Sequence, residues 1–137
     1  MKVLFCAGMS PIVADREASL AFYEQTLGIA FQRDDDSEYV SVNNLDGLKH
    51  MGLWQLSDAA SACFGTPEWP NDLPVPQATV EFDVDDVDAA ASELQAAGYH
   101  LLHDPVTMPW GQRIVHVLSP ERLLVGLTYT PSMREER

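Results

Sequence analysis

The feature that most constrains this chain of 137 residues is an internal duplication. Asp15 and Asp86 occupy equivalent places, each after an apolar-rich segment and before a helical pattern. An aspartate in that place can cap a helix by accepting hydrogen bonds from its free N–H groups. Gly28 and Gly98 follow the two helical patterns, where a glycine suits the left-handed residue that ends a helix. The sequence therefore predicts two copies of one structural unit.

Both copies continue in the same way after the helix. Strand-like segments are expected over residues 37–43 and 49–55 in the first copy, and over 112–118 and 124–129 in the second. Each half is therefore predicted to fold as a β-α-β-β-β module. One helix can cover only one face of such a sheet, which leaves the other face apolar. We expect an α+β protein in which two modules with mixed, curved sheets enclose a shared cavity.

The domain organisation follows from this duplication. Residues 1–66 form the first predicted module and residues 77–130 the second. The segment 67–76 contains four prolines, which cannot donate to a β-ladder or continue a helix, and we interpret it as a linker. Residues 131–137 are expected to form a C-terminal tail.

The charge of the chain limits its partners. Eight basic and 21 acidic residues give a formal net charge of −13, so nucleic acid and anionic membranes are not expected to bind. No stretch approaches the roughly 20 apolar residues of a membrane span, and the N-terminal segment indicates a strand and not a signal peptide. Cys6 and Cys63 lack the spacing of a metal or redox motif and are expected to be reduced thiols. We expect a cytoplasmic protein.

Several motifs, in this order and spacing, resemble those of the vicinal oxygen chelate superfamily, which includes glyoxalase, bleomycin-resistance proteins and extradiol dioxygenases. The first module carries an Asp-x3-Ser-x2-Phe-Tyr-x3-Leu-Gly pattern over residues 15–28, and the second carries Phe-Asp-Val-Asp-Asp-Val-Asp over residues 82–88. Residues 119–122 resemble the family's Asp-Pro-Asp-Gly turn, with Arg122 in place of the glycine, and residues 109–112 resemble a loop of the bleomycin-resistance-like branch. The resemblance implies a homodimer.

Enzymes of that family hold a divalent metal with His, Gln or Glu side chains on the first and last strands of each module. The matching positions in this chain are Gly8, Gly52, Thr79 and Gly126. Glycine has no ligand atom in its side chain, and one threonine hydroxyl is a poor ligand alone. We therefore expect no metal at the family's position and no cofactor.

Other side chains could bind a ligand in the cavity. We assign this role to His50, Trp54, Thr79, Glu81, Trp110, Gln112 and Arg113. For some of them the alternative is purely structural: His50 as a satisfied polar group, Glu81 as a solvated rim residue or as the partner of Arg113, and the tryptophans as core.

The remaining histidines are given no role in the cavity. His100 and His103 are expected at the surface, and His116 is expected to point away from the cavity towards a helix. The run Asp34–Asp36 is predicted to be a solvated turn.

Three functions are consistent with these features. The first is a metal-independent binding protein that sequesters an aromatic or cationic organic ligand. The second is a lyase, isomerase or dioxygenase of the same superfamily, with a displaced metal or with His50 and Glu81 as an acid–base pair. The third is a scaffold whose cavity is filled by its own side chains.

Overall fold

The fold is described here from a computed structural model, which covers residues 1–34 and 37–134. Its strands are β1 (Val3–Val13), β2 (Gln32–Arg33), β3 (Val40–Val42), β4 (Met51–Gln55), β5 (Ala78–Val84), β6 (Val106–Thr107), β7 (Arg113–Leu118) and β8 (Leu124–Tyr129). Its helices are α1 (Arg16–Leu20), which continues into the π-helix η1 (Ala21–Thr26), α2 (Leu56–Phe64), α3 (Val87–Ala96) and the short 3₁₀-helix η2 (Pro131–Met133).

The eight strands form one mixed sheet in the order β2-β3-β4-β1-β5-β8-β7-β6. Within each module the first and last strands pair in parallel, β1 with β4 and β5 with β8. The two modules join through the antiparallel pair β1–β5. The predicted β-α-β-β-β order of each half is confirmed, and the sheets of the two halves are continuous.

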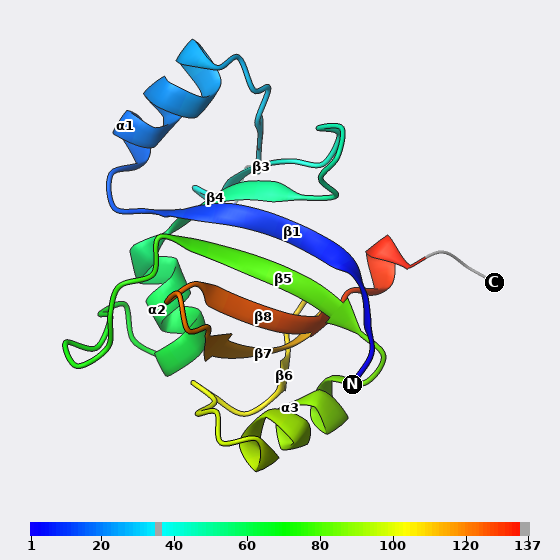
Figure 1. Cartoon of the computed structure of the whole chain (residues 1–137). Helices are drawn as coiled ribbons and strands as arrows, with labels where there is room; N and C mark the ends of the chain where they lie inside the picture. Colours follow the sequence, from blue (N-terminus) through cyan, green and yellow to red (C-terminus); the bar gives the residue numbers. More distant parts are fainter. Residues whose placement is uncertain (35–36, 135–137) are drawn as a thin grey trace.

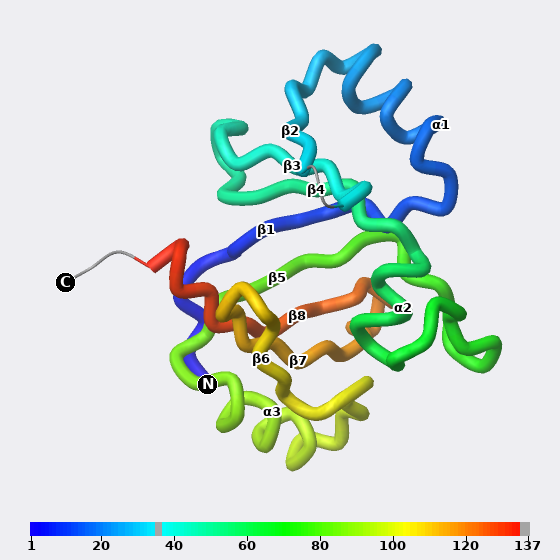
Figure 2. Tube along the Cα trace, turned by 180° about the vertical axis from the view of Figure 1, so that it is seen from behind, coloured from blue at the N-terminus to red at the C-terminus, as the bar shows by residue number. Residues whose placement is uncertain are grey.

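The helices α1 and α3 cover one face of the sheet. Figures 1 and 2 show α1 beside β3 and β4 at one end of the sheet and α3 beside β7 at the other end. Alternate side chains of the strands pack against these two helices in separate apolar clusters, which include Val40, Leu53, Val84, Val115 and Leu127. We call the opposite face, which carries Gly52, Trp54, Thr79, Glu81 and His116, the inner face.

The predicted helix caps are confirmed. The side chain of Asp15 accepts a hydrogen bond from the backbone N–H of Ala18 at 3.1 Å, and Asp86 accepts one from Ala89 at 3.0 Å. Gly28 and Gly98 follow the helices with positive φ angles of 78° and 93°.

The helix α2 was not predicted, and it changes the expected cavity. It packs on the inner face through Ala59 and Cys63, which contact an apolar cluster that includes Ile12, Trp54 and Leu124. Figure 2 shows α2 in front of one end of the strands. The inner face is thus partly covered by a segment of the chain itself.

The connection between the modules contains neither helix nor strand from residue 65 to residue 77, as expected for the proline-rich linker. The division into two domains at this segment remains a prediction. Arg122, which replaces the family's glycine, has a φ angle of 70° and is the only non-glycine residue with positive φ in the described chain.

Parts of two predictions lie outside the described residues, namely Asp35 and Asp36 of the predicted turn and residues 135–137 of the tail. In the part of the chain that the structure covers, none of the helices combines the length and the apolar character that crossing a membrane would require.

Candidate functional site

The centre of the inner face in the first module is occupied by Tyr39. The backbone N–H of Gly52 donates a hydrogen bond to Ser10 Oγ at 2.9 Å, which fixes β4 beside β1. A Cβ atom built on Gly52 would lie 1.9 Å from the hydroxyl oxygen of Tyr39. The Tyr39 side chain therefore lies where a metal ligand at position 52 would have to be.

The other three predicted metal positions are also unsuited to a ligand set. A Cβ atom on Gly126 would lie 3.2 Å from Glu81 Cγ, and one on Gly8 would lie 2.6 Å from the His50 carbonyl oxygen. Thr79 is 3 % exposed, and its hydroxyl has no hydrogen-bond partner among the described residues. These residues do not fit the divalent metal that the family's enzymes hold.

Tyr39, His50 and Asn43 form a short hydrogen-bond chain beside this centre. The Tyr39 hydroxyl and His50 Nε2 are 2.6 Å apart, and His50 Nδ1 and Asn43 Oδ1 are also 2.6 Å apart. Because Asn43 Oδ1 can only accept, His50 carries its proton on Nδ1 and its Nε2 accepts from the tyrosine. Burial raises the pKa of Tyr39 to about 12 and lowers the pKa of His50, so both groups are held neutral.

A second hydrogen-bond chain runs from the surface to the interior of the second module. The indole N–H of Trp110 donates to Gln112 Oε1 at 3.0 Å, and Gln112 Nε2 donates to Glu81 Oε1 at 3.2 Å and to Thr130 Oγ1 at 3.1 Å. Burial, with a smaller contribution from the nearby charge of Asp83, raises the pKa of Glu81. The structure thus brings together three of the predicted site residues, namely Trp110, Gln112 and Glu81.

The predicted orientations of Arg113 and His116 were wrong. The hairpin of β7 and β8 pairs His116, and not Arg113, with Gly126. A shift of one residue in register exchanges the faces of a strand. His116 therefore points to the inner face and is completely buried, whereas Arg113 lies on the side of α3 and forms two hydrogen bonds with Asp88, at 2.9 and 2.7 Å. The alternative pairing of Arg113 with Glu81 is excluded by the same contacts.

The remaining predicted residues are not members of the Trp110–Gln112–Glu81 hydrogen-bond chain. Trp54 packs in the cluster beneath α2, and its ring centroid is 6.1 Å from that of His116. His50 belongs to the chain of Tyr39 and Asn43. His100 is exposed as predicted, but His103 is only partly exposed and contacts His116.

Sequence reasoning missed one group of side chains altogether. Cys63, His103 and His116 form the only cluster of three or more His, Cys, Asp or Glu side chains within residues 1–34 and 37–134 that is close enough to hold a metal ion. It joins α2 to the second module and uses none of the four family positions, although His116 is the strand partner of Gly126. No spacing motif could have indicated it, because the three residues come from a helix, a loop and a strand that meet only in the folded chain.

The two hydrogen-bond chains supply uncharged donors and acceptors on the inner face. The Tyr39 hydroxyl already donates to His50, and the Gln112 amide already donates to Glu81 and Thr130, whereas a protonated Glu81 has a donor without a partner among the described residues. Asp83, although completely buried, is fully engaged by Thr128, Thr130 and Arg134 and acts as a structural group. The Glu81 carboxyl is therefore the group in these two chains that could interact with a polar or cationic organic molecule.

Comparisons with known proteins agree with this fold. The family model of the Glyoxalase/Bleomycin resistance protein/Dioxygenase superfamily matches residues 10–127. Among curated proteins, none gives a significant match.

Solved structures of low sequence identity share the fold. A glyoxalase/bleomycin resistance protein/dioxygenase superfamily member from Vibrio splendidus 12B01 superposes with a TM-score of 0.57 at 17 % identity, over 88 % of this chain and 95 % of that chain. The hypothetical protein BH1468 from Bacillus halodurans C-125 gives a TM-score of 0.59 at 15 % identity, over 96 % of this chain and 98 % of that one. The family match spans most of the chain, and the duplicated β-α-β-β-β fold agrees with it. The chain belongs to the glyoxalase/bleomycin resistance protein/dioxygenase superfamily.

Proposed function

We propose that this protein is a metal-independent receptor that sequesters a small organic molecule, and that the ligand is an aromatic cation. The observation that carries the proposal is the hydrogen-bond chain from exposed Trp110 through Gln112 to Glu81. It places an aromatic surface and a carboxyl group within one connected site on a face where the family's metal position lacks ligands.

Trp110 provides the aromatic contact. Its side chain is 69 % exposed, while the hydrogen bond from its indole N–H to Gln112 fixes the orientation of the ring. An exposed and oriented indole ring can stack on a flat ligand and attracts a cation over its face. The residue therefore supports binding of an aromatic cation.

Glu81 provides the charge. In the free protein its raised pKa favours the neutral acid, but a cation bound nearby stabilises the carboxylate. The net charge of −13 adds a field that increases the encounter rate with cations. Charge selectivity should therefore depend on Glu81, whereas affinity for the ring should depend on Trp110.

Three probes with one ring system test this proposal by isothermal titration calorimetry. N-methylquinolinium, quinoline and quinoline-2-carboxylate carry a positive, a neutral and a negative charge. We expect the cation to bind most tightly. Glu81→Gln should weaken binding of the cation about tenfold, which corresponds to roughly 1.4 kcal/mol, because the charge that attracts the quinolinium is removed, and it should leave quinoline unchanged. Trp110→Ala should weaken both.

Arg113→Met is the matched control, because Arg113 lies on the outer side of the sheet against α3. It should leave all three affinities unchanged, and added divalent cations or EDTA should not alter binding of the quinolinium probe. Equal affinity for the three probes, or binding that requires a divalent metal, would contradict the proposal.

An acid–base enzyme is the second candidate, and the short Tyr39–His50–Asn43 chain favours it. A neutral His50 with its Nε2 towards a tyrosine hydroxyl could accept a proton. However, His50 and Glu81 belong to separate hydrogen-bond chains and are not joined to each other as a pair within the described residues. If a bound ligand is recovered unchanged after prolonged incubation, the result supports the receptor. If the wild type converts the ligand into a product and His50→Gln does not, the result supports the enzyme.

A further inference from the structure

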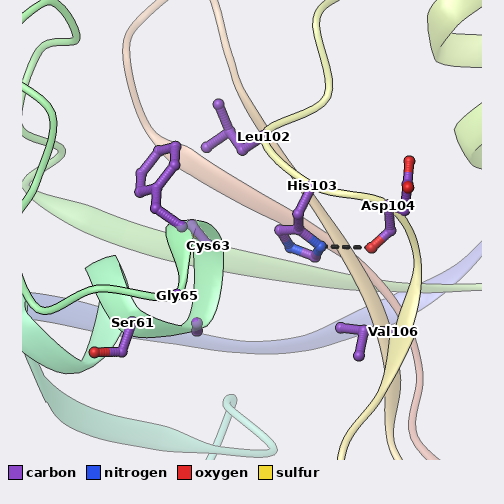
Figure 3. Close-up of a pocket in the computed structure, with 9 residues that line it drawn as sticks. Ser61, Cys63, Gly65, Leu102, His103, Asp104 and Val106 are labelled. Atoms are coloured by element: carbon purple, nitrogen blue, oxygen red, sulfur yellow. Dashed lines mark hydrogen bonds between the residues drawn. The ribbon is translucent and has the colours of Figure 1, made fainter.

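Three side chains that commonly bind metals meet beside α2. Cys63 lies in the last turns of α2, His103 lies in the loop between α3 and β6, and His116 lies on β7. Their ligand atoms all lie within 4.8 Å of one another. Figure 3 shows Cys63 and His103 on the two sides of a surface hollow of about 510 Å³, with the ring of His103 between the helix and the loop.

The loop holds His103 in the orientation of a metal ligand. Its Nδ1 lies 2.6 Å from the carbonyl oxygen of Asp104, which can only accept, so the proton is on Nδ1 and the lone pair is on Nε2. Metal-binding histidines are commonly fixed in this way, with the second ring nitrogen donating to a backbone carbonyl. The Nε2 atom of His103 points into the cluster, where it lies 2.8 Å from His116 Nδ1.

His116 is left with an unpartnered nitrogen in the protein interior. His116 Nδ1 lies 2.8 Å from His103 Nε2, so Nδ1 must be the donor in this contact. His116 Nε2 then carries a lone pair, and the side chain is completely buried with no hydrogen-bond partner for this atom among the described residues. A buried polar atom without a partner is costly, so a cation or a donor that takes this lone pair would stabilise the cluster.

We propose that Cys63, His103 and His116 bind one Zn²⁺ ion. A thiolate and two imidazoles form the borderline-soft S/N ligand set that zinc takes, whereas magnesium and calcium require oxygen ligands. Ligand atoms around a tetrahedral zinc lie roughly 3.3–3.6 Å apart for bond lengths of about 2.0–2.3 Å. Binding would require the hydrogen bond between His116 and His103 to open, because the ion takes the lone pair of His103 Nε2 that accepts it. Cys63 binds as the thiolate, and its proton is released to solvent.

The family's metal position lies on the first and last strands of the modules. The ligands of the site proposed here come instead from α2, a loop and β7. Three protein ligands leave one coordination position open, and the hollow lined by Ser61, Leu102, Asp104 and Val106 gives solvent or a small ligand access to it. The ion would also join α2 to the loop and strand of the second module. We therefore expect zinc to stabilise the packing of α2 on the inner face.

Cobalt(II) is the probe that tests the ligands directly, because it replaces zinc in tetrahedral sites and is coloured. We expect the full-length protein, freed of metal by a chelator, to bind one Co²⁺ per chain with a thiolate-to-metal charge-transfer band and strong visible bands. Zn²⁺ should displace it and raise the melting temperature by mass action. Cys63→Ala should abolish the charge-transfer band, and His103→Gln should weaken Zn²⁺ binding at least tenfold.

Cys6→Ala and His100→Gln are the matched controls, since both side chains are exposed and outside the cluster. They should leave the spectrum and the affinity unchanged. His103 is partly exposed, so His103→Gln should fold even if a change at buried Cys63 does not. A Co²⁺ spectrum without thiolate character, or Zn²⁺ affinity unaffected by His103→Gln, would overturn the proposal.

Discussion

Glu81 lies in surroundings that favour its protonated form. The inner face surrounds the carboxyl group, Asp83 lies two residues away on the same strand face, and the Tyr39 hydroxyl is near enough for the charge of Glu81 to raise the pKa of Tyr39. Among the described residues, only the amide of Gln112 favours the carboxylate by hydrogen bonding. The pKa of Glu81 is therefore higher in the folded protein than in the unfolded chain.

The raised pKa of Glu81 fixes the sign with which the stability of the folded protein depends on pH. Because the folded state holds the proton more tightly, Glu81 contributes most stability below its ordinary pKa of 4.5, and the contribution is lost as the pH rises through the raised pKa. Glu81→Gln is uncharged at every pH. The variant should therefore gain stability relative to the wild type as the pH rises from 4.5 through the raised pKa of Glu81.

Urea unfolding across this pH range measures the difference. Glu121→Gln, in the exposed turn between β7 and β8, removes the same charge and serves as control. A gain of the same size in both variants would show that overall charge, and not the surroundings of Glu81, is responsible.

Individual residues were predictable where the strand register was known. The alternation of Tyr39, Ser41 and Asn43 with the buried Val40 and Val42 was a signal that Tyr39 and Asn43 share a face, although it did not show that the tyrosine would lie over Gly52. The predicted orientations of Arg113 and His116 were wrong because the register of the β7–β8 hairpin differs by one residue from the expected register. A strand in which four consecutive residues are buried gives no alternation that would reveal the error.

At the level of elements, the two helix starts depend on single aspartate side chains. Asp86 begins α3, whose residues Val87, Ala90 and Ala91 form part of the core of the second module. Without the cap, the N–H of Ala89 would lose its hydrogen bond to the Asp86 carboxylate. Loss of this helix would therefore destabilise the packing of the second module.

Asp86→Ala should lower the free energy of unfolding by about 1 kcal/mol. Asp86→Asn keeps an oxygen acceptor at the same place and should recover most of this loss, apart from the small interaction of the charge with the helix dipole. Thermal and urea unfolding of the two variants give the measurement. Equal destabilisation by alanine and asparagine would show that the charge, and not the cap, is the stabilising feature.

The helix α2 shows why part of the candidate site could not be predicted. Its sequence from Leu56 to Phe64 has small residues and only a moderate apolar stripe, and it lies in a segment where the repeated module has no counterpart. Periodicity and duplication predicted the elements that occur twice. They could not predict an unpaired helix, nor the meeting of Cys63 with His103 and His116 that its packing causes.

At the scale of the whole molecule, the duplicated modules share one sheet through β1 and β5, and short two-residue strands form both sheet edges. The homodimer that the family resemblance implies remains a prediction. A second copy would bring a further charge of −13 against the first, so association should be weaker at low ionic strength. Sedimentation velocity at two salt concentrations would test this dependence.

The same charge acts within one chain. Compact folding brings 21 acidic and only eight basic side chains together, and their mutual repulsion destabilises the folded state. The Debye length falls from about 30 Å at 0.01 M salt to about 8 Å at 0.15 M, so salt should screen the repulsion between distant surface charges. We expect the melting temperature to rise with sodium chloride over this range and then to level off. The measurement should be repeated at several protein concentrations, because a shift that depends on concentration would reflect association instead of screening. A melting temperature that is constant or falls with salt would show that local ion pairs, such as Arg33–Glu24 and Arg113–Asp88, outweigh the net repulsion.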